Sequence, residues 1–180
     1  MPEYTKEIKN KMKKAAISGE WSQIKPLLQQ YGNELASVYF NGGLNLNFTV
    51  LHYIVCSAPD IKASVESIKN LVAIECVDIE ARNYVGSTPL HWASISGKVN
   101  LLRELILCGA IIDTEDNYGH TPILDCCDHA VFFGEEINLK KEKILKLLKN
   151  PPRTYKQELI DKRNLLVMIF NKLIPLGTKR

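Results

Sequence analysis

The 180-residue sequence contains no long hydrophobic run. Its longest apolar segment, residues 165–170, is far shorter than the roughly 20 residues that a membrane-spanning helix needs. Charged residues recur through residues 3–14, where a signal peptide would have an apolar core. We therefore expect a cytoplasmic protein, with delivery into a host cell as an alternative destination.

The sequence also lacks a disulfide framework. Its five cysteines are odd in number and irregularly spaced: Cys56, Cys76, Cys108, Cys126 and Cys127. The cluster that most resembles a set of metal ligands, residues 126–129, has no second Cys/His pair at the spacing of a zinc site. We expect Cys126 to pack as a small apolar residue. We expect no metal and no cofactor.

A catalytic constellation is missing as well. Cys127 and His129 could supply a nucleophile and a base, but no third residue is placed to orient them. The sequence has no Gly-rich phosphate loop. We expect no catalytic residues, no small-molecule substrate and no enzyme activity.

Charge is present but unevenly distributed along the chain. Residues 15–139 carry six Lys and Arg against fifteen Asp and Glu, whereas residues 140–180 carry twelve against three. Residues 1–14 are also basic, with five Lys against two Glu. An acidic middle between two basic ends is a weak indication of the partner's charge.

The most informative feature is an internal repeat. Thr-Pro-Leu-His at residues 88–91 recurs as Thr-Pro-Ile-Leu at residues 121–124, each time with Gly two positions before the Thr. A looser copy, Thr-Val-Leu-His, occupies residues 49–52. Thr is a good N-cap and Pro suits the first helical position, so each copy predicts the start of a helix.

A second pattern follows each of these helix starts. Two apolar residues lie three and four positions after a first one, as in Leu102, Leu105 and Ile106, which predicts a helix with one buried face. The same spacing occurs near the start of the chain, at residues 24–28. Four helix-pair units therefore align, and residues 111–119 predict a short strand, an exposed turn and a return between two of them.

Residues 83–122 resemble the ankyrin family. They match the family pattern Asp-x-x-Gly-x-Thr-Pro-Leu-His-x-Ala, followed by Leu-Leu-x-x-Gly-Ala, at most positions. The resemblance implies an all-α solenoid of helix-turn-helix units with short β-hairpin fingers, in a single domain over residues 1–180. The expected units are 5–43, 44–82, 83–115 and 116–150, with a C-terminal capping helix at 154–173.

Other repeats depart from that pattern. The second unit has Asn47 in place of Gly and Val50 in place of Pro, and about five extra residues between its helices. The fourth unit has Leu124 in place of His and extra residues near 132–134. In the family the histidine, here His52 or His91, connects neighbouring turns by hydrogen bonds.

The resemblance implies a protein–protein interaction module that acts as an inhibitor, an adaptor or a host-directed effector. Ankyrin proteins bind partners through finger tips and a concave face. The positions that match those contacts are Arg82, Tyr84, Val85, Ser87, Ile95, Ser96, Glu115, Asn117, Tyr118 and His120, with Asp128 and His129 as further candidates. Acidic neighbours predict a partner with a basic patch, bound by a monomer.

An alternative function uses the basic region 140–180, which could bind an anionic polymer or a membrane surface. Its lysines alternate with apolar residues at helical spacing, which is also what a solvated helix face looks like. No nucleic-acid-binding motif accompanies them. We therefore favour a protein partner over nucleic acid or membrane.

Overall fold

The computed structural model describes residues 4–40, 47–129, 135–154, 157–158 and 160–161. The named helices of the described chain are α1 (Lys6–Ser18), α2 (Trp21–Tyr31), the 3-10 helix η1 (Asn33–Ser37), α3 (Val50–Ser57), α4 (Lys62–Val72), α5 (Pro89–Ile95), α6 (Val99–Leu107), α7 (Pro122–His129) and α8 (Glu135–Lys149).

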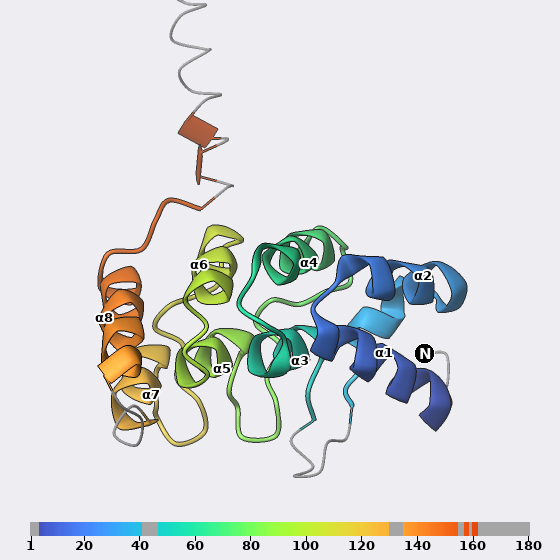
Figure 1. Cartoon of the computed structure of the whole chain (residues 1–180), viewed down its shortest axis with the longest axis horizontal. Helices are drawn as coiled ribbons and strands as arrows, with labels where there is room; N and C mark the ends of the chain where they lie inside the picture. Colours follow the sequence, from blue (N-terminus) through green and yellow to red (C-terminus); the bar gives the residue numbers. More distant parts are fainter. Residues whose placement is uncertain (1–3, 41–46, 130–134, 155–156, 159, 162–180) are drawn as a thin grey trace, which may run out of the picture.

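The helices form two layers (Figure 1). Helices α1, α3, α5 and α7 pack side by side in an inner layer, and α2, α4, α6 and α8 pack in the same order in an outer layer. Loops extend from the inner layer on the side away from the outer helices. This stack of helix pairs is an α-solenoid, as the sequence predicted.

The core lies between the layers and is continuous along the stack. Leu102, Leu105 and Ile106 of α6 are buried there, which confirms the apolar face predicted from their spacing. Helix α5 begins with Pro89 directly after the N-cap residue Thr88, as predicted. At the second unit, Asn47 has a φ of 52°, so it occupies the left-handed conformation of the glycine that it replaces.

The fingers are tight turns and not β-hairpins: within the described residues, β pairing is limited to an isolated bridge between Phe40 and Phe48. The predicted capping helix 154–173 lies mostly outside the described residues, although residues 157–158 and 160–161 are helical. The boundaries between units stay a prediction.

Candidate binding surface on the fingers

Finger A, residues 82–87, is a turn organised by one asparagine. The Asn83 Oδ1 atom accepts hydrogen bonds from the backbone N–H groups of Val85 (3.1 Å) and Ser87 (2.9 Å). The Asn83 N–H donates to the Ser87 carbonyl (3.1 Å) and closes the turn. Tyr84 sits at the tip with 73% of its surface exposed.

Finger B, residues 115–120, repeats this turn with an aspartate. The Asp116 Oδ1 atom accepts from the N–H groups of Tyr118 and His120, both at 2.9 Å. The Asp116 N–H donates to the His120 carbonyl (2.9 Å). Tyr118 occupies the tip and is 72% exposed. The two fingers therefore present tyrosines at equivalent positions.

Direct hydrogen bonds join the two fingers. Arg82 Nη1 donates to the Glu115 carbonyl at 2.8 Å. The Asn117 N–H donates to the Val85 carbonyl (3.1 Å), and Asn117 Nδ2 donates to the Tyr84 carbonyl (3.3 Å). The tyrosines are thus carried on turns that are fixed relative to one another.

Buried histidines connect each finger to the helix of the preceding unit. His52 Nε2 donates to the Ser87 carbonyl (3.1 Å), and His91 Nε2 donates to the His120 carbonyl (3.0 Å). In each histidine, Nδ1 faces the hydroxyl of the N-cap threonine at 2.8 Å, Thr49 for the first histidine. This arrangement confirms the predicted structural role of both histidines.

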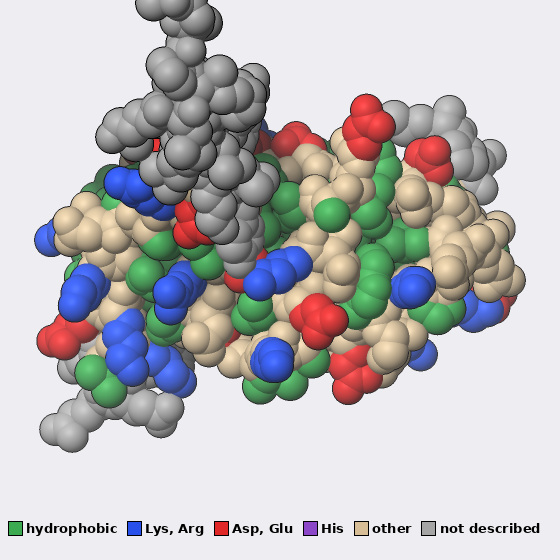
Figure 2. All heavy atoms as spheres, turned by 90° about the horizontal axis from the view of Figure 1, so that it is seen from above, with side chains coloured by type: hydrophobic (Ala, Val, Ile, Leu, Met, Phe, Trp, Pro, Cys, Tyr) green, Lys and Arg blue, Asp and Glu red, His purple; other side chains and the backbone are tan. Residues whose placement is uncertain are grey.

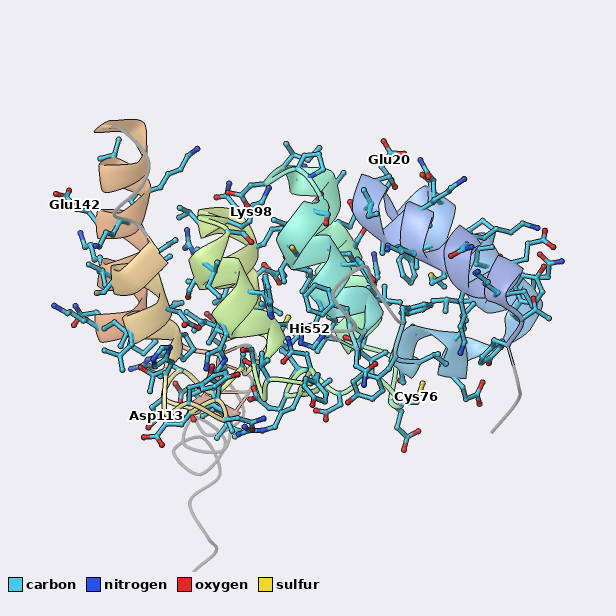
Figure 3. The ribbon with its side chains drawn as sticks, turned by 90° about the horizontal axis from the view of Figure 1, so that it is seen from below. Glu20, His52, Cys76, Lys98, Asp113 and Glu142 are labelled. Carbon is cyan, nitrogen blue, oxygen red and sulfur yellow. The ribbon has the colours of Figure 1, made fainter. Side chains whose placement is uncertain are left out.

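His52 is held in its neutral form. Burial lowers its pKa to about 4, and this effect outweighs the hydrogen bond to the Ser87 carbonyl, which raises it. A neutral imidazole that donates from Nε2 accepts at Nδ1, which is the role that its threonine neighbour requires. Figure 3, seen from the finger side, labels His52 on α3.

The structure places the ten predicted contact residues in three classes of exposure. Exposed residues are Arg82, Tyr84, Glu115, Asn117 and Tyr118; half-buried residues are Val85, Ile95, Ser96 and His120; Ser87 is buried. The prediction that Ser87 is a surface contact is wrong. Its side chain is only 4% exposed, because the turn folds it under the tip while its carbonyl faces His52.

The residues predicted on the concave face, Ile95 and Ser96, lie apart from the hydrogen bonds of the fingers. Ile95 ends α5 and Ser96 is its C-cap, at the opposite end of that helix from finger A. Within the described chain, no hydrogen bond or ring contact joins either residue to a finger. Residues 128 and 129 belong to α7, and their side chains lie outside the described residues.

Acidic side chains surround the fingers, but not all of them are available to a partner. Glu80 accepts from the Ile111 N–H (2.9 Å) and the Thr114 hydroxyl (3.4 Å), so it helps to hold the loop before finger B. Asp113 and Glu115 are exposed, and Asp113 is labelled on the finger loops in Figure 3. These two carboxylates give the surface its negative charge.

Sequence reasoning assigned Arg82 and Asn117 to the partner and missed that they connect the fingers. It also gave no role to the side chains of Asn83 and Asp116. A signal for the second pair was present: Asn or Asp three positions before Gly is typical of an Asx turn. No comparable signal marks a hydrogen bond from a side chain to a backbone carbonyl 33 residues away.

The described residues were also compared with the requirements of a membrane span, a metal site and a reactive thiol. In the described ranges, no helix is long and apolar enough to cross a membrane, and no three potential ligand side chains gather for a metal ion. Cys126 is buried, as predicted, and burial raises the pKa of its thiol to about 11. This thiol is therefore protonated near neutral pH and is a poor nucleophile.

Comparison with known proteins agrees with this architecture. A family model described as ankyrin repeats in three copies matches residues 51–151. A variola virus protein named Ankyrin repeat protein OPG189 is 30% identical over 94 residues, which are 50% of this chain and 16% of the viral protein. Calmodulin-binding transcription activator homolog 1 of Caenorhabditis elegans is 28% identical over 129 residues, 66% of this chain and 11% of that protein.

A third relative, Serine/threonine-protein kinase VIK of Arabidopsis thaliana, is 27% identical over 84 residues, 47% of this chain and 17% of the kinase. The chain therefore spans less than a fifth of the length of these relatives. The family match extends over more than half of the chain and includes finger A, finger B and both buried histidines. On this evidence, the chain belongs to the ankyrin repeat family.

Proposed function

We propose that the chain binds a partner protein through fingers A and B, with Ile95 and Ser96 of the concave face as further contacts. Ankyrin repeats are in general protein–protein interaction modules, and the family is typically non-enzymatic. The observation that carries the proposal is the pair of tyrosines at the finger tips. Among the exposed large hydrophobic residues of the described chain, Tyr84 and Tyr118 are the most exposed, and neither contributes to the core.

The chemistry of these tips suits a binding site. Tyrosine offers a large contact area and a hydroxyl while losing little conformational entropy, and it is enriched at binding hot spots. The hydrogen bonds of Arg82 and Asn117 between the fingers fix the backbone beneath the rings before a partner arrives. Preorganisation of this kind lowers the entropic cost of association.

Charge supports a partner with a basic patch. Asp113 and Glu115 lie exposed beside Tyr118, and opposite charge on a partner would speed the encounter. We further propose that the chain acts as a monomer in a cytoplasm, as an inhibitor, an adaptor or a host-directed effector. The variola virus relative supports the last of these roles, and the identity of the partner decides among the three.

The test begins with capture of partners on the wild-type chain and on Tyr84→Ala/Tyr118→Ala. Because both side chains are exposed, we expect the double variant to keep its melting temperature while partner affinity falls by about 2 kcal/mol or more. A matched control, Ile61→Ala/Leu139→Ala, truncates two exposed apolar residues on other elements and should bind normally. Unchanged affinity in the tyrosine variant would move the site off the fingers.

A further inference from the structure

Two adjoining grooves run along the outer layer, on the side away from the fingers. One lies between α4 and α6 and has a volume of about 460 Å³; the other lies between α6 and α8 and has a volume of about 300 Å³. Asn100 and Arg103 line both, so the grooves form one continuous surface across three helices. Figure 2 looks down on this side of the molecule and shows blue side chains over α6 and α8.

The charge of this surface is the reverse of what the local sequence predicts. The acidic stretch 15–139 has only six basic residues, yet Lys62, Lys69 and Arg103 all line the first groove. Lys143 and Lys146 of α8 extend the same charge into the second groove. The folded chain therefore gathers five cations that are scattered over 85 positions of sequence.

The acidic residues nearest these cations are already engaged. The Asp60 carboxylate, beside Asn100, accepts from the backbone N–H groups of Asn100 (3.2 Å) and Leu101 (3.0 Å). Glu104 is the carboxylate that lines the first groove, but it is nearly buried and its Oε2 atom lies 3.9 Å from Lys69 Nζ. The exposed acids of the neighbouring helices, Glu66 on α4 and Glu142 on α8, do not line either groove.

Four of the five cations have no partner within the described chain. Lys62, Arg103, Lys143 and Lys146 are exposed, and none of them makes a hydrogen bond or an ion pair with another described residue. Like charges gathered without compensation repel one another, and an anionic ligand would relieve that repulsion.

The floor of the grooves is apolar. Val65 and Leu107 lie in the first groove, Val99 and Leu147 in the second, and all four are half-buried. A ligand that fits must therefore present apolar groups as well as negative charge. A nucleic acid backbone would leave this floor uncovered, and the described residues that line the two grooves include no aromatic ring on which a base could stack.

We propose that this outer basic face, defined by the five cations and four aliphatic residues above, binds an acidic segment of a partner protein. Apolar side chains of the segment enter the two grooves, and its carboxylates face Arg103, Lys143 and Lys146. The site is independent of the fingers, because it lies on the opposite layer and shares no residue with them. A partner could therefore occupy both surfaces of the chain at once.

The probe is a fluorescein-labelled peptide of about 16 residues, with leucines at helical spacing and glutamates between them. Fluorescence anisotropy is measured with the full chain, and a peptide of the same composition with scrambled leucines serves as the ligand control. We expect the ordered peptide to bind at least about tenfold more tightly than the scrambled one, because only the former presents a continuous apolar face to the floor.

Variants locate the binding. Arg103→Glu/Lys146→Glu should weaken peptide binding by about tenfold or more, while Lys14→Glu/Lys25→Glu should change it by no more than about twofold. Both pairs change the net charge equally, but Lys14 and Lys25 line neither groove. A thermal melt reports whether charge reversal impairs folding. If it does, the milder pair Arg103→Gln/Lys146→Gln replaces it and should still bind the peptide more weakly than the control pair does.

Three results would overturn the proposal. The wild-type chain could fail to bind the ordered peptide, or the control pair could weaken binding as much as the groove pair. A single-stranded oligonucleotide or phosphatidylserine vesicles could instead bind more tightly than the peptide and displace it, which would assign the face to an anionic polymer or to a lipid surface.

Discussion

Fingers A and B have the same local turn but different surroundings. In each finger, an Asn or Asp side chain accepts hydrogen bonds from two backbone N–H groups, and a tyrosine occupies the tip. Yet Asn83 and Ser87 of finger A are buried, whereas Asp116 and His120 of finger B are half-buried.

The difference comes from the neighbouring units. Finger A is held by His52 from the unit before it and by Asn117 from the unit after it. Finger B is bonded to finger A through the same contacts and to His91 of the unit before it, but among the described residues no hydrogen bond reaches it from a following unit. Leu124, at the position that histidine occupies in the second and third units, is 45% exposed. The residues that form the turn are therefore present within each repeat, whereas we expect the rigidity of a finger to depend on the repeats that flank it, as in a solenoid.

The largest expected contrast is between Gly86→Ala and Gly119→Ala. Both glycines have a left-handed φ, 80° and 77°, so both substitutions carry a similar backbone cost. A Cβ at Gly86 would lie 2.4 Å from Asn117 Oδ1 and 2.8 Å from the Asn117 backbone N, whereas a Cβ at Gly119 meets no atom within 4 Å. We expect Gly86→Ala to lower the free energy of unfolding by about 4 kcal/mol and Gly119→Ala by about 1 kcal/mol.

Urea denaturation of the two variants beside wild type measures this contrast. Equal losses of stability would mean that the neighbouring finger does not press against finger A.

Acid should lower the stability that the hydrogen bond from His52 to the Ser87 carbonyl of finger A contributes. The folded-state pKa of His52 is about 4, below the unfolded value of about 6.5, so the unfolded chain binds the proton more readily. The contribution is therefore complete above pH 6.5 and is lost as the pH falls toward 4, by up to about 3 kcal/mol. His52→Gln, which can still donate to the Ser87 carbonyl, should show a flatter stability profile between these pH values. Parallel profiles for the two proteins would contradict the assignment.

The fourth unit has Leu124 where the third has His91, so the two residues can be exchanged in opposite directions. His91→Leu should cost about 2–3 kcal/mol, because it leaves the buried Thr88 hydroxyl and the His120 carbonyl without this partner. Leu124→His should change stability by no more than about 0.5 kcal/mol, since this position is exposed at the end of the series of histidine–carbonyl hydrogen bonds. Thermal melts compare them, and a large gain from Leu124→His would reveal a bonding partner beyond finger B.

Much of the fold could be predicted from local sequence. Thr88 and Pro89 determine a helix start through their own backbone and side chain, and the spacing around Leu105 determines which face is buried. These effects act within a few residues, so one sequence suffices to recognise them.

The parts that failed depend on contacts between units. Ser87 is polar and lies near a finger tip, and only the histidine of the preceding unit explains its burial. The buried Glu104 interrupts the apolar face of α6, and no spacing rule predicts its pairing with Lys69 of the adjacent helix. The outer basic face was hidden for the same reason, because its cations come from three helices that are separated in sequence.

Amide hydrogen exchange tests most directly the claim that the two fingers share a turn but differ in bracing. The Ser87 N–H and the His120 N–H each donate to an Asx side chain at 2.9 Å, so local geometry alone predicts equal protection. We predict that the Ser87 amide exchanges as slowly as the amides of the core. The opening reaction that exposes the His120 amide should have a free energy at least about 2 kcal/mol lower. Equal protection of the two amides would contradict the account and show that the turn by itself sets the rigidity of each finger.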